Sequence, residues 1–219
     1  MIGILAHRGI WDENVEPNSL EALSNSIKSG FGIETDLRDH EGRIVISHDM
    51  PRSPVLLFED FLNEYYELIK SVDNQQYLAL NIKSDGLQVE IKRILSEFKI
   101  DKYFFFDMSI PDTFPYIKNN LNIFLRHSDY EEPSKNFDKY DGVWIDHFES
   151  EWFSPKDLDL YLHNDKKICF VSPELHHREY TKCWEMIKKY IDEIKISDRK
   201  NIMICTDKTH EALDFFYEE

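Results

Sequence analysis

The 219-residue chain has few cysteines and no long hydrophobic run, and each shortage excludes a class of protein. Its three cysteines (Cys169, Cys183 and Cys205) are widely spaced and odd in number, so they outline neither a disulfide framework nor a CxxC metal motif. No stretch approaches the ~18 apolar residues of a membrane span, and the first residues lack the basic region of a signal peptide. We therefore expect a cytoplasmic protein without stable membrane insertion.

Positive charge is also scarce, with 26 Lys and Arg against 42 Asp and Glu and a formal net charge of −16. A field of that sign opposes binding to nucleic acid or to anionic lipid surfaces. A small phosphate-bearing substrate would still need a local cationic pocket, so single basic residues near a site matter more than the total. Nothing in the composition implies a protein partner.

Linkers and low-complexity segments are absent as well, which favours one domain spanning residues 1–219. Apolar runs alternate with amphipathic stretches along the whole chain. Strands are expected at 2–6, 32–37, 77–83, 103–106, 122–126, 142–146, 167–172 and 201–206, with a short extra strand at 43–47. This alternation predicts an α/β fold with a parallel sheet. Eight units favour a compact (β/α)₈ TIM barrel, with short loops because such barrels typically need about 250 residues. A doubly wound open sheet is the alternative.

Most strands are followed by a predicted helix, at 18–29, 58–72, 87–98, 112–119, 155–162, 180–194 and 209–217. In the first of these, Leu20, Leu23 and Ile27 recur at helical spacing. Asn18 is the expected N-cap, and Gly30 is placed to end the helix.

Polar side chains follow nearly every predicted strand, at the end where a (β/α)₈ barrel carries its chemistry. They are His7, Arg8, Glu34, Asp36, Asn81, Lys83, Asp107, Arg126, Asp146, Glu174 and Asp207. If the chain forms a barrel, these groups converge on one mouth.

Glu34 and Asp36 give the sharpest local signal, because alternate residues of a strand share one face. Two carboxylates side by side repel each other, and a hard divalent cation such as Mg²⁺ or Ca²⁺ relieves that repulsion. A pair of solvated acids at a fraying strand end is the plainer alternative. By the same alternation Asn81 and Lys83 share a face, and Lys83 is either a phosphate-binding point charge or a surface lysine.

His7 and His48 each follow an apolar run. Either histidine alone is typical of a structural residue. Two of them flanking a carboxylate pair, with Arg8 beside one, can supply a general acid, a general base and a cation for phosphate.

These residues together resemble a known family. Ala6-His7-Arg8-Gly9, then Asn18-Ser19, then Gly32-Ile33-Glu34-Thr35-Asp36, then Ile44-Val45-Ile46-Ser47-His48-Asp49 are similar in order and spacing to the signature of the glycerophosphodiester phosphodiesterases. The likeness covers roughly residues 4–50, with weaker echoes at 80–83 and 204–207.

The resemblance implies a (β/α)₈ barrel of the phospholipase-C-like phosphodiesterase type that depends on Mg²⁺ or Ca²⁺. It implies that Glu34 and Asp36 bind the metal, that His7 and His48 act as acid and base, and that Arg8 holds phosphate. Asn81 stands where the family usually has a third metal-binding Glu. Its neutral oxygen can still ligate the cation, or an acid elsewhere compensates; the candidates are Asp49, Asp146 and Glu174.

Arg126 and Glu174 complete the expected set, as substrate-binding residues. Glu174 lies in a dense polar segment, residues 172–178, that either reads the alcohol part of the substrate or forms a solvated loop. Trp144 and Trp152 either stack on a substrate or pack in the core.

The function expected from these residues is metal-dependent hydrolysis of a small glycerophosphodiester-like or sugar-linked phosphodiester to an alcohol and a phosphomonoester. Two alternatives remain open. One is a phospholipase-D-like lyase that forms a cyclic phosphate. The other is a phosphate-binding barrel without turnover, which Asn81 favours and the paired His7 and His48 oppose.

Overall fold

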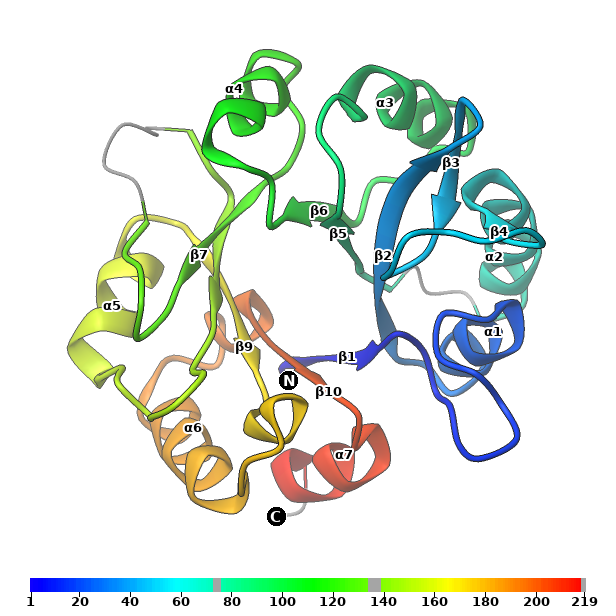
Figure 1. Ribbon diagram of the computed structural model, residues 1–219. Helices are drawn as coiled ribbons and strands as arrows, with labels where there is room; N and C mark the ends of the chain where they lie inside the picture. Colours follow the sequence, from blue (N-terminus) through cyan, green and yellow to red (C-terminus); the bar gives the residue numbers. More distant parts are fainter. Residues whose placement is uncertain (73–75, 134–138, 218–219) are drawn as a thin grey trace. The chain divides into compact units, whose positions relative to one another are not determined.

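The computed structural model describes residues 1–72, 76–133 and 139–217, and strands alternate with helices through them (Figure 1). The chain divides into two compact units, Ala6–Ile123 and Met1–Leu5 with Phe124–Glu219. Each unit is described by itself below. Within the described residues, no helix combines the length and the apolar character needed to cross a membrane.

The unit Ala6–Ile123 contains five strands besides the last residues of β1 (Gly3–His7), and four helices among its described residues. The strands are β2 (Gly32–His40), β3 (Arg43–Ile46), β4 (Leu56–Leu57), β5 (Leu78–Ile82) and β6 (Tyr103–Phe106). The helices are α1 (Leu20–Lys28), α2 (Phe58–Val72), α3 (Gln88–Glu97) and α4 (Ile110–Lys118).

Strand β2 organises this unit. Its first half pairs in parallel with β5, and its second half pairs with β3 in an antiparallel hairpin. The register places Glu34 opposite Ala79 and Asp36 opposite Asn81. Because partners in register on parallel strands project to the same face, Asp36 and Asn81 are neighbours at the carboxyl ends of their strands.

Aromatic residues fill the core of this unit, where the rings of Phe58, Phe61 and Tyr65 on α2 pack in series. Helices α1 and α2 contact each other, and α2 also contacts β3. Burial of Leu80 and Ile82 on the helix-facing side of β5 leaves Asn81 on the other face, as the alternation of the sequence predicted.

The unit Met1–Leu5 with Phe124–Glu219 carries the second half of the alternation. Its strands are β7 (Phe124–His127), β8 (Gly142–Ile145), β9 (Lys167–Val171) and β10 (Ile202–Thr206), each parallel to the next. Its helices are α5 (Pro155–His163), α6 (Thr181–Glu193) and α7 (Thr209–Tyr217), with short 3₁₀ turns at Pro173–His176 and Arg199–Asn201. Strands β8 to β10 are almost wholly buried, which is typical of parallel strands covered on both faces.

The structure corrects some local expectations. Ser19, not Asn18, is the N-cap of α1, because its side chain accepts from the backbone of Ala22. Leu20 is 38% exposed and lies outside the buried stripe of α1. The short strand β4 was not predicted from the sequence.

Four other residues agree with the plainer interpretations of the sequence. All three cysteines are free and buried. Trp144 is buried in β8.

Candidate functional site

The turn after β1 brings Arg8 to the end of β2. Arg8 and Asn18 both have left-handed backbone angles, with φ of 57° and 62°, and the Asn18 N–H donates to the Arg8 carbonyl at 2.8 Å. Gly9 makes this possible, since a Cβ there would lie 2.5 Å from the backbone of Ala22 in α1. Two non-glycine residues held in this sparsely populated region are typical of a functional site.

Asp36 is the centre of the charged cluster in this unit. It is 1% exposed, yet two cations reach it. Arg8 Nε lies 3.2 Å from its Oδ2, and Lys83 Nζ lies 3.3 Å from its Oδ1. Asn18 Nδ2 also donates to Oδ2 at 2.8 Å, and Thr35 Oγ1 fixes Asn18 by donating to its Oδ1 at 2.7 Å.

Arg8 keeps donors available in this arrangement. Within the part of the chain that the structure describes, its contacts involve only the backbone and Nε, so Nη1 and Nη2 hydrogen-bond no protein atom. The side chain of Arg8 is 26% exposed. A guanidinium held through Nε with a free outer edge is suited to binding two phosphate oxygens.

Glu34 is buried beside this cluster. Its Oε2 accepts from the backbone N–H of Arg8 at 3.3 Å. Burial, and next the negative charge of Asp36, raise the pKa of Glu34 to about 7, against the opposing charges of His7, Lys83 and Arg8. Burial makes the charged form of this carboxyl group unfavourable, and a cation bound beside it would stabilise that charged form.

Two of the predicted metal ligands have an oxygen that accepts no hydrogen bond. Asp36 Oδ1 and Asn81 Oδ1 are both buried and accept no hydrogen bond. Among the described residues, no three His, Cys, Asp or Glu side chains gather as a metal site. The two carboxylates and the amide of Asn81 instead supply hard oxygen ligands on adjacent strands, and this donor set fits Mg²⁺ or Ca²⁺.

The two candidate catalytic histidines lie in the same unit. His7 ends β1 and influences the ionisation of Glu34. His48 follows β3, directly after Ser47, whose N–H donates to the Asp36 carbonyl at 3.0 Å. The His48 side chain is 43% exposed, and its Nδ1 lies 3.0 Å from Oδ1 of Asp49. That contact involves Nδ1 and Asp49, the residue that the sequence offered as a substitute metal ligand.

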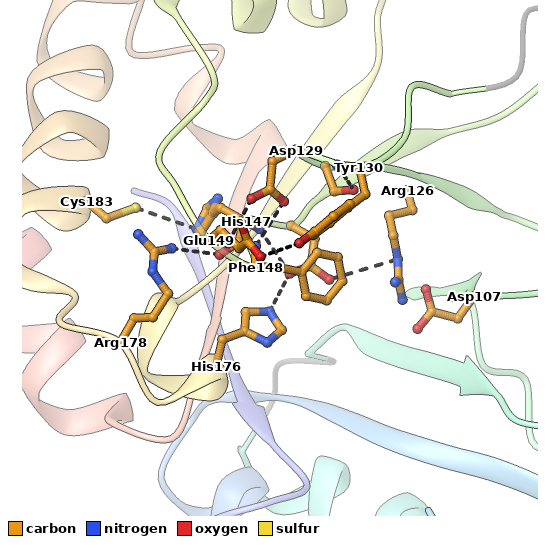
Figure 2. A network of polar contacts seen from close by, with 12 residues as sticks. Asp107, Arg126, Asp129, Tyr130, His147, Phe148, Glu149, His176, Arg178 and Cys183 are labelled. Atoms are coloured by element: carbon orange, nitrogen blue, oxygen red, sulfur yellow. Dashed lines mark hydrogen bonds and ion pairs between the residues drawn. The ribbon is translucent and has the colours of Figure 1, made fainter.

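Arg126, Asp146 and Glu174 lie in the other unit, and Figure 2 shows a polar network that includes Arg126 and His176. Asp146 is 3% exposed, and its Oδ1 is 2.6 Å from Nε2 of His176. Arg126 Nε lies 3.9 Å from the second oxygen of Asp146. The centroid of the Phe148 ring lies 4.6 Å from the centroid of the His176 ring and 5.4 Å from Cζ of Arg126.

Arg126 also lines an open hollow of about 530 Å³, with Tyr130 and Phe148 among the other lining residues. This is compatible with the expected role of Arg126 in substrate binding. Trp152 is half-buried, donates to the Asp146 carbonyl at 2.7 Å and packs on His127.

The segment after β9 is fastened on both sides of His176. Glu174 accepts from the hydroxyls of Ser172 and Thr206 and from the backbone of Asp207. Arg178 donates to the His147 carbonyl at 2.7 Å and to Glu151 at 2.6 Å. Glu174 therefore ties this segment to the end of β10, and substrate binding by Glu174 stays a prediction.

His147 and Cys183 form a buried pair below this segment, 3.6 Å apart (Figure 2). Burial lowers the pKa of His147 to about 4 and raises the pKa of Cys183 to about 12. Both groups are neutral at pH 7, so neither acts as a charged catalyst there.

Sequence reasoning missed two residues that the structure ties to these clusters. Asn18 was taken as a helix cap but holds Asp36, and its place in the Asn18-Ser19 part of the family-like motif was the available signal. His176 lies in the segment singled out for its density of polar groups, yet only Glu174 was chosen from it.

No family model and no curated protein sequence matches this chain, so the comparison with known proteins rests on solved structures. A provisionally assigned glycerophosphodiester phosphodiesterase from Galdieria sulphuraria aligns with a TM-score of 0.73 at 14% identity, over 99% of this chain and 98% of that one. The glycerophosphodiester phosphodiesterase from Agrobacterium tumefaciens aligns with a TM-score of 0.62 at 12% identity, over 99% of both chains.

This chain has the fold of the glycerophosphodiester phosphodiesterases. The same fold extends to a Ca²⁺-dependent phosphatidylinositol-specific phospholipase C from Streptomyces antibioticus, with a TM-score of 0.64 at 8% identity, over 98% of this chain and 96% of that one. The predicted α/β fold class, a (β/α)₈ barrel of the phospholipase-C-like type, is therefore confirmed. These TM-scores over nearly the whole chain establish the fold. The sequence identities are too low to transfer residue roles, so those roles are argued from the site.

Proposed function

We propose that this protein is a phosphodiesterase that uses Mg²⁺ or Ca²⁺ to hydrolyse a small glycerophosphodiester-like or sugar-linked phosphodiester. The observation that carries the proposal is the cluster around Asp36. The buried carboxylate of Asp36 lies between Arg8 and Lys83 and beside Glu34, and neither its own Oδ1 nor Oδ1 of Asn81 accepts a hydrogen bond. The Ca²⁺-dependent phospholipase C with the same fold supports the expectation of a divalent cation.

Glu34, Asp36 and Asn81 would hold the cation in this proposal. When bound, the cation supplies Lewis acidity to the phosphate and neutralises charge that develops on its oxygens. Arg8 adds a fixed positive charge through its free outer edge, and Lys83 adds a second one near Asp36. Both are preorganised, because their contacts with Asp36 hold them in place before substrate arrives.

His7 and His48 divide the proton transfers. One histidine takes the proton of the attacking water as the new P–O bond forms. The other gives a proton to the leaving alcohol oxygen as the old P–O bond breaks. Asp49 orients His48 through Nδ1, which directs Nε2 outward toward a substrate. The products are an alcohol and a phosphomonoester.

A panel of phosphodiesters tests the proposal by measuring the released alcohol with and without Mg²⁺, Ca²⁺ and Mn²⁺. We expect turnover that needs a divalent cation and falls sharply in His7→Ala. Detection of a cyclic phosphate by ³¹P NMR would assign the lyase reaction instead. Phosphate binding without turnover on any member of the panel would indicate a binding protein and overturn the proposed activity.

A further inference from the structure

The side-chain amide of Asn81 has a defined orientation. Its Nδ2 donates to Oδ2 of Asp107, the residue that follows β6, at 3.1 Å. An ionised carboxylate accepts hydrogen bonds and cannot donate them, so the amide nitrogen of Asn81 must face Asp107. The amide oxygen is thereby turned away from Asp107.

Among the described residues, no donor hydrogen-bonds to the side-chain oxygen of Asn81. Asn81 is 7% exposed, and its Oδ1 accepts no hydrogen bond. Its partner in register on β2 is Asp36, whose buried Oδ1 also accepts none and has Lys83 Nζ at 3.3 Å. A buried acceptor without a partner is energetically unfavourable. Two such acceptors on neighbouring strands indicate a ligand that binds oxygen.

We propose that Asp107 is a positioning residue that fixes the amide of Asn81 so that its oxygen serves as a ligand for the divalent cation. This inference rests on the proposed function, because it concerns the same cation. Asn81 itself is neutral, and Asp107 supplies negative charge one hydrogen bond behind it. Outer carboxylates that orient a ligand in this way strengthen metal binding, and their loss typically weakens it about 10–100-fold.

A purely structural role for Asp107 makes a different prediction. Asp107 has a left-handed backbone angle, with φ of 64°, and its hydrogen bond to Asn81 joins the ends of β5 and β6. If the residue only closed this turn, its replacement would change the stability of the protein and leave its cation affinity unchanged. Cation affinity is therefore the measurement that separates the two roles.

The first experiment is isothermal titration of the whole chain with Mg²⁺ and with Ca²⁺. In Asp107→Asn the negative charge is lost and either end of the Asn81 amide can face the new side chain. We expect affinity about tenfold weaker than in the wild type. Asp85→Asn is the matched control, because it removes one negative charge in the same unit, from a residue that accepts from Ser109 and does not contact Asn81. Its affinity should be unchanged.

The second experiment moves the carboxylate across the hydrogen bond. In the double variant Asn81→Asp with Asp107→Asn, the new amide must donate to the new carboxylate, so the orientation is again fixed. We expect affinity equal to the wild type or tighter. Unfolding midpoints in EDTA provide a metal-free readout, in which Asn81→Asp alone should be destabilised by two facing carboxylates and the double variant should recover.

The outcomes separate the two proposals. A wild type that binds cation, with equal affinity in Asp107→Asn, overturns the positioning role and leaves the proposed function standing. A double variant as weak as Asp107→Asn overturns it too. A wild type that binds neither cation overturns the metal dependence itself. Lack of recovery of the double variant in EDTA would show that Asp107 does not orient residue 81.

Discussion

The clusters around Asp36 and around Asp146 are built from similar residues and differ in what they leave unpaired. Each has a buried aspartate, within β2 for Asp36 and directly after β8 for Asp146, with basic side chains next to it. Around Asp36, two oxygens accept no hydrogen bond, and the outer nitrogens of Arg8 contact no described protein atom. Around Asp146, the neighbouring charged groups are joined to protein partners, with Glu174 taking three donors and Arg178 giving two.

This difference separates a site prepared for a ligand from a network that holds a segment in place. Unsatisfied buried polar atoms are costly, and a bound ligand is one way in which such atoms are completed. The Asp36 cluster has that property at two adjacent oxygens. In the second network, His147 Nδ1 is the exception, and burial keeps that ring uncharged. We therefore expect the chemistry to depend mainly on the first cluster and the stability of the segment after β9 on the second.

The largest expected effect is on turnover. Replacing His7 or His48 with Ala should lower kcat by about 10²–10⁴, the usual contribution of a positioned proton-transfer group. The double variant should lose less than the product of the two, because the groups act together. The exposed His163→Ala is the control. A loss of the same size in His176→Ala would break the comparison, since it would place chemistry in the second network.

The next effect concerns acid stability. The folded pKa of His147 is about 4, below the 6.5 of the unfolded chain, so between these values the unfolded state binds a proton that the folded state does not. Stability should therefore fall as the pH drops from 6.5 to 4, by about 3 kcal/mol from this residue. Urea unfolding of the wild type and of His147→Leu tests this. Parallel pH curves for the two proteins would show that His147 titrates normally.

A smaller effect is expected from Glu174. Replacement by Ala leaves the hydroxyl of Thr206 and the N–H of Asp207 without their acceptor, so we expect the free energy of unfolding to fall by about 2 kcal/mol. Glu185→Ala, on the exposed face of α6, should change little and serves as the control. A rise in KM with unchanged stability would instead support the substrate-binding role predicted from the sequence.

The smallest expected effect is a gain. Asn81→Glu introduces a carboxylate next to Asp36 and should tighten Mg²⁺ or Ca²⁺ binding about tenfold, equal to ~1.4 kcal/mol. Isothermal titration measures it, with Asn63→Glu on the exposed face of α2 as the charge-matched control. Unchanged affinity would mean that residue 81 does not ligate the cation. Weaker affinity would mean that the added carboxylate crowds Glu34 and Asp36.

The sequence by itself determined the alternation of strands and helices, because hydrophobic periodicity and turn residues are local properties. It also singled out His7, Arg8, Glu34, Asp36 and His48 as candidate site residues, since a short ordered motif carries them. The parity that puts Asn81 beside Asp36 was readable in the same way, from the apolar neighbours of Asn81 on β5.

Only the tertiary structure decided how these groups are satisfied. Asn18 reaches Asp36 across 18 residues, Asn81 reaches Asp107 across 26, and Glu174 reaches Thr206 across 32. Each contact joins segments that are distant in the sequence, so no local pattern encodes it. The orientation of the Asn81 amide and the two unpaired oxygens follow from these long-range contacts, because a hydrogen bond depends on where two distant segments meet and not on the residues next to either partner.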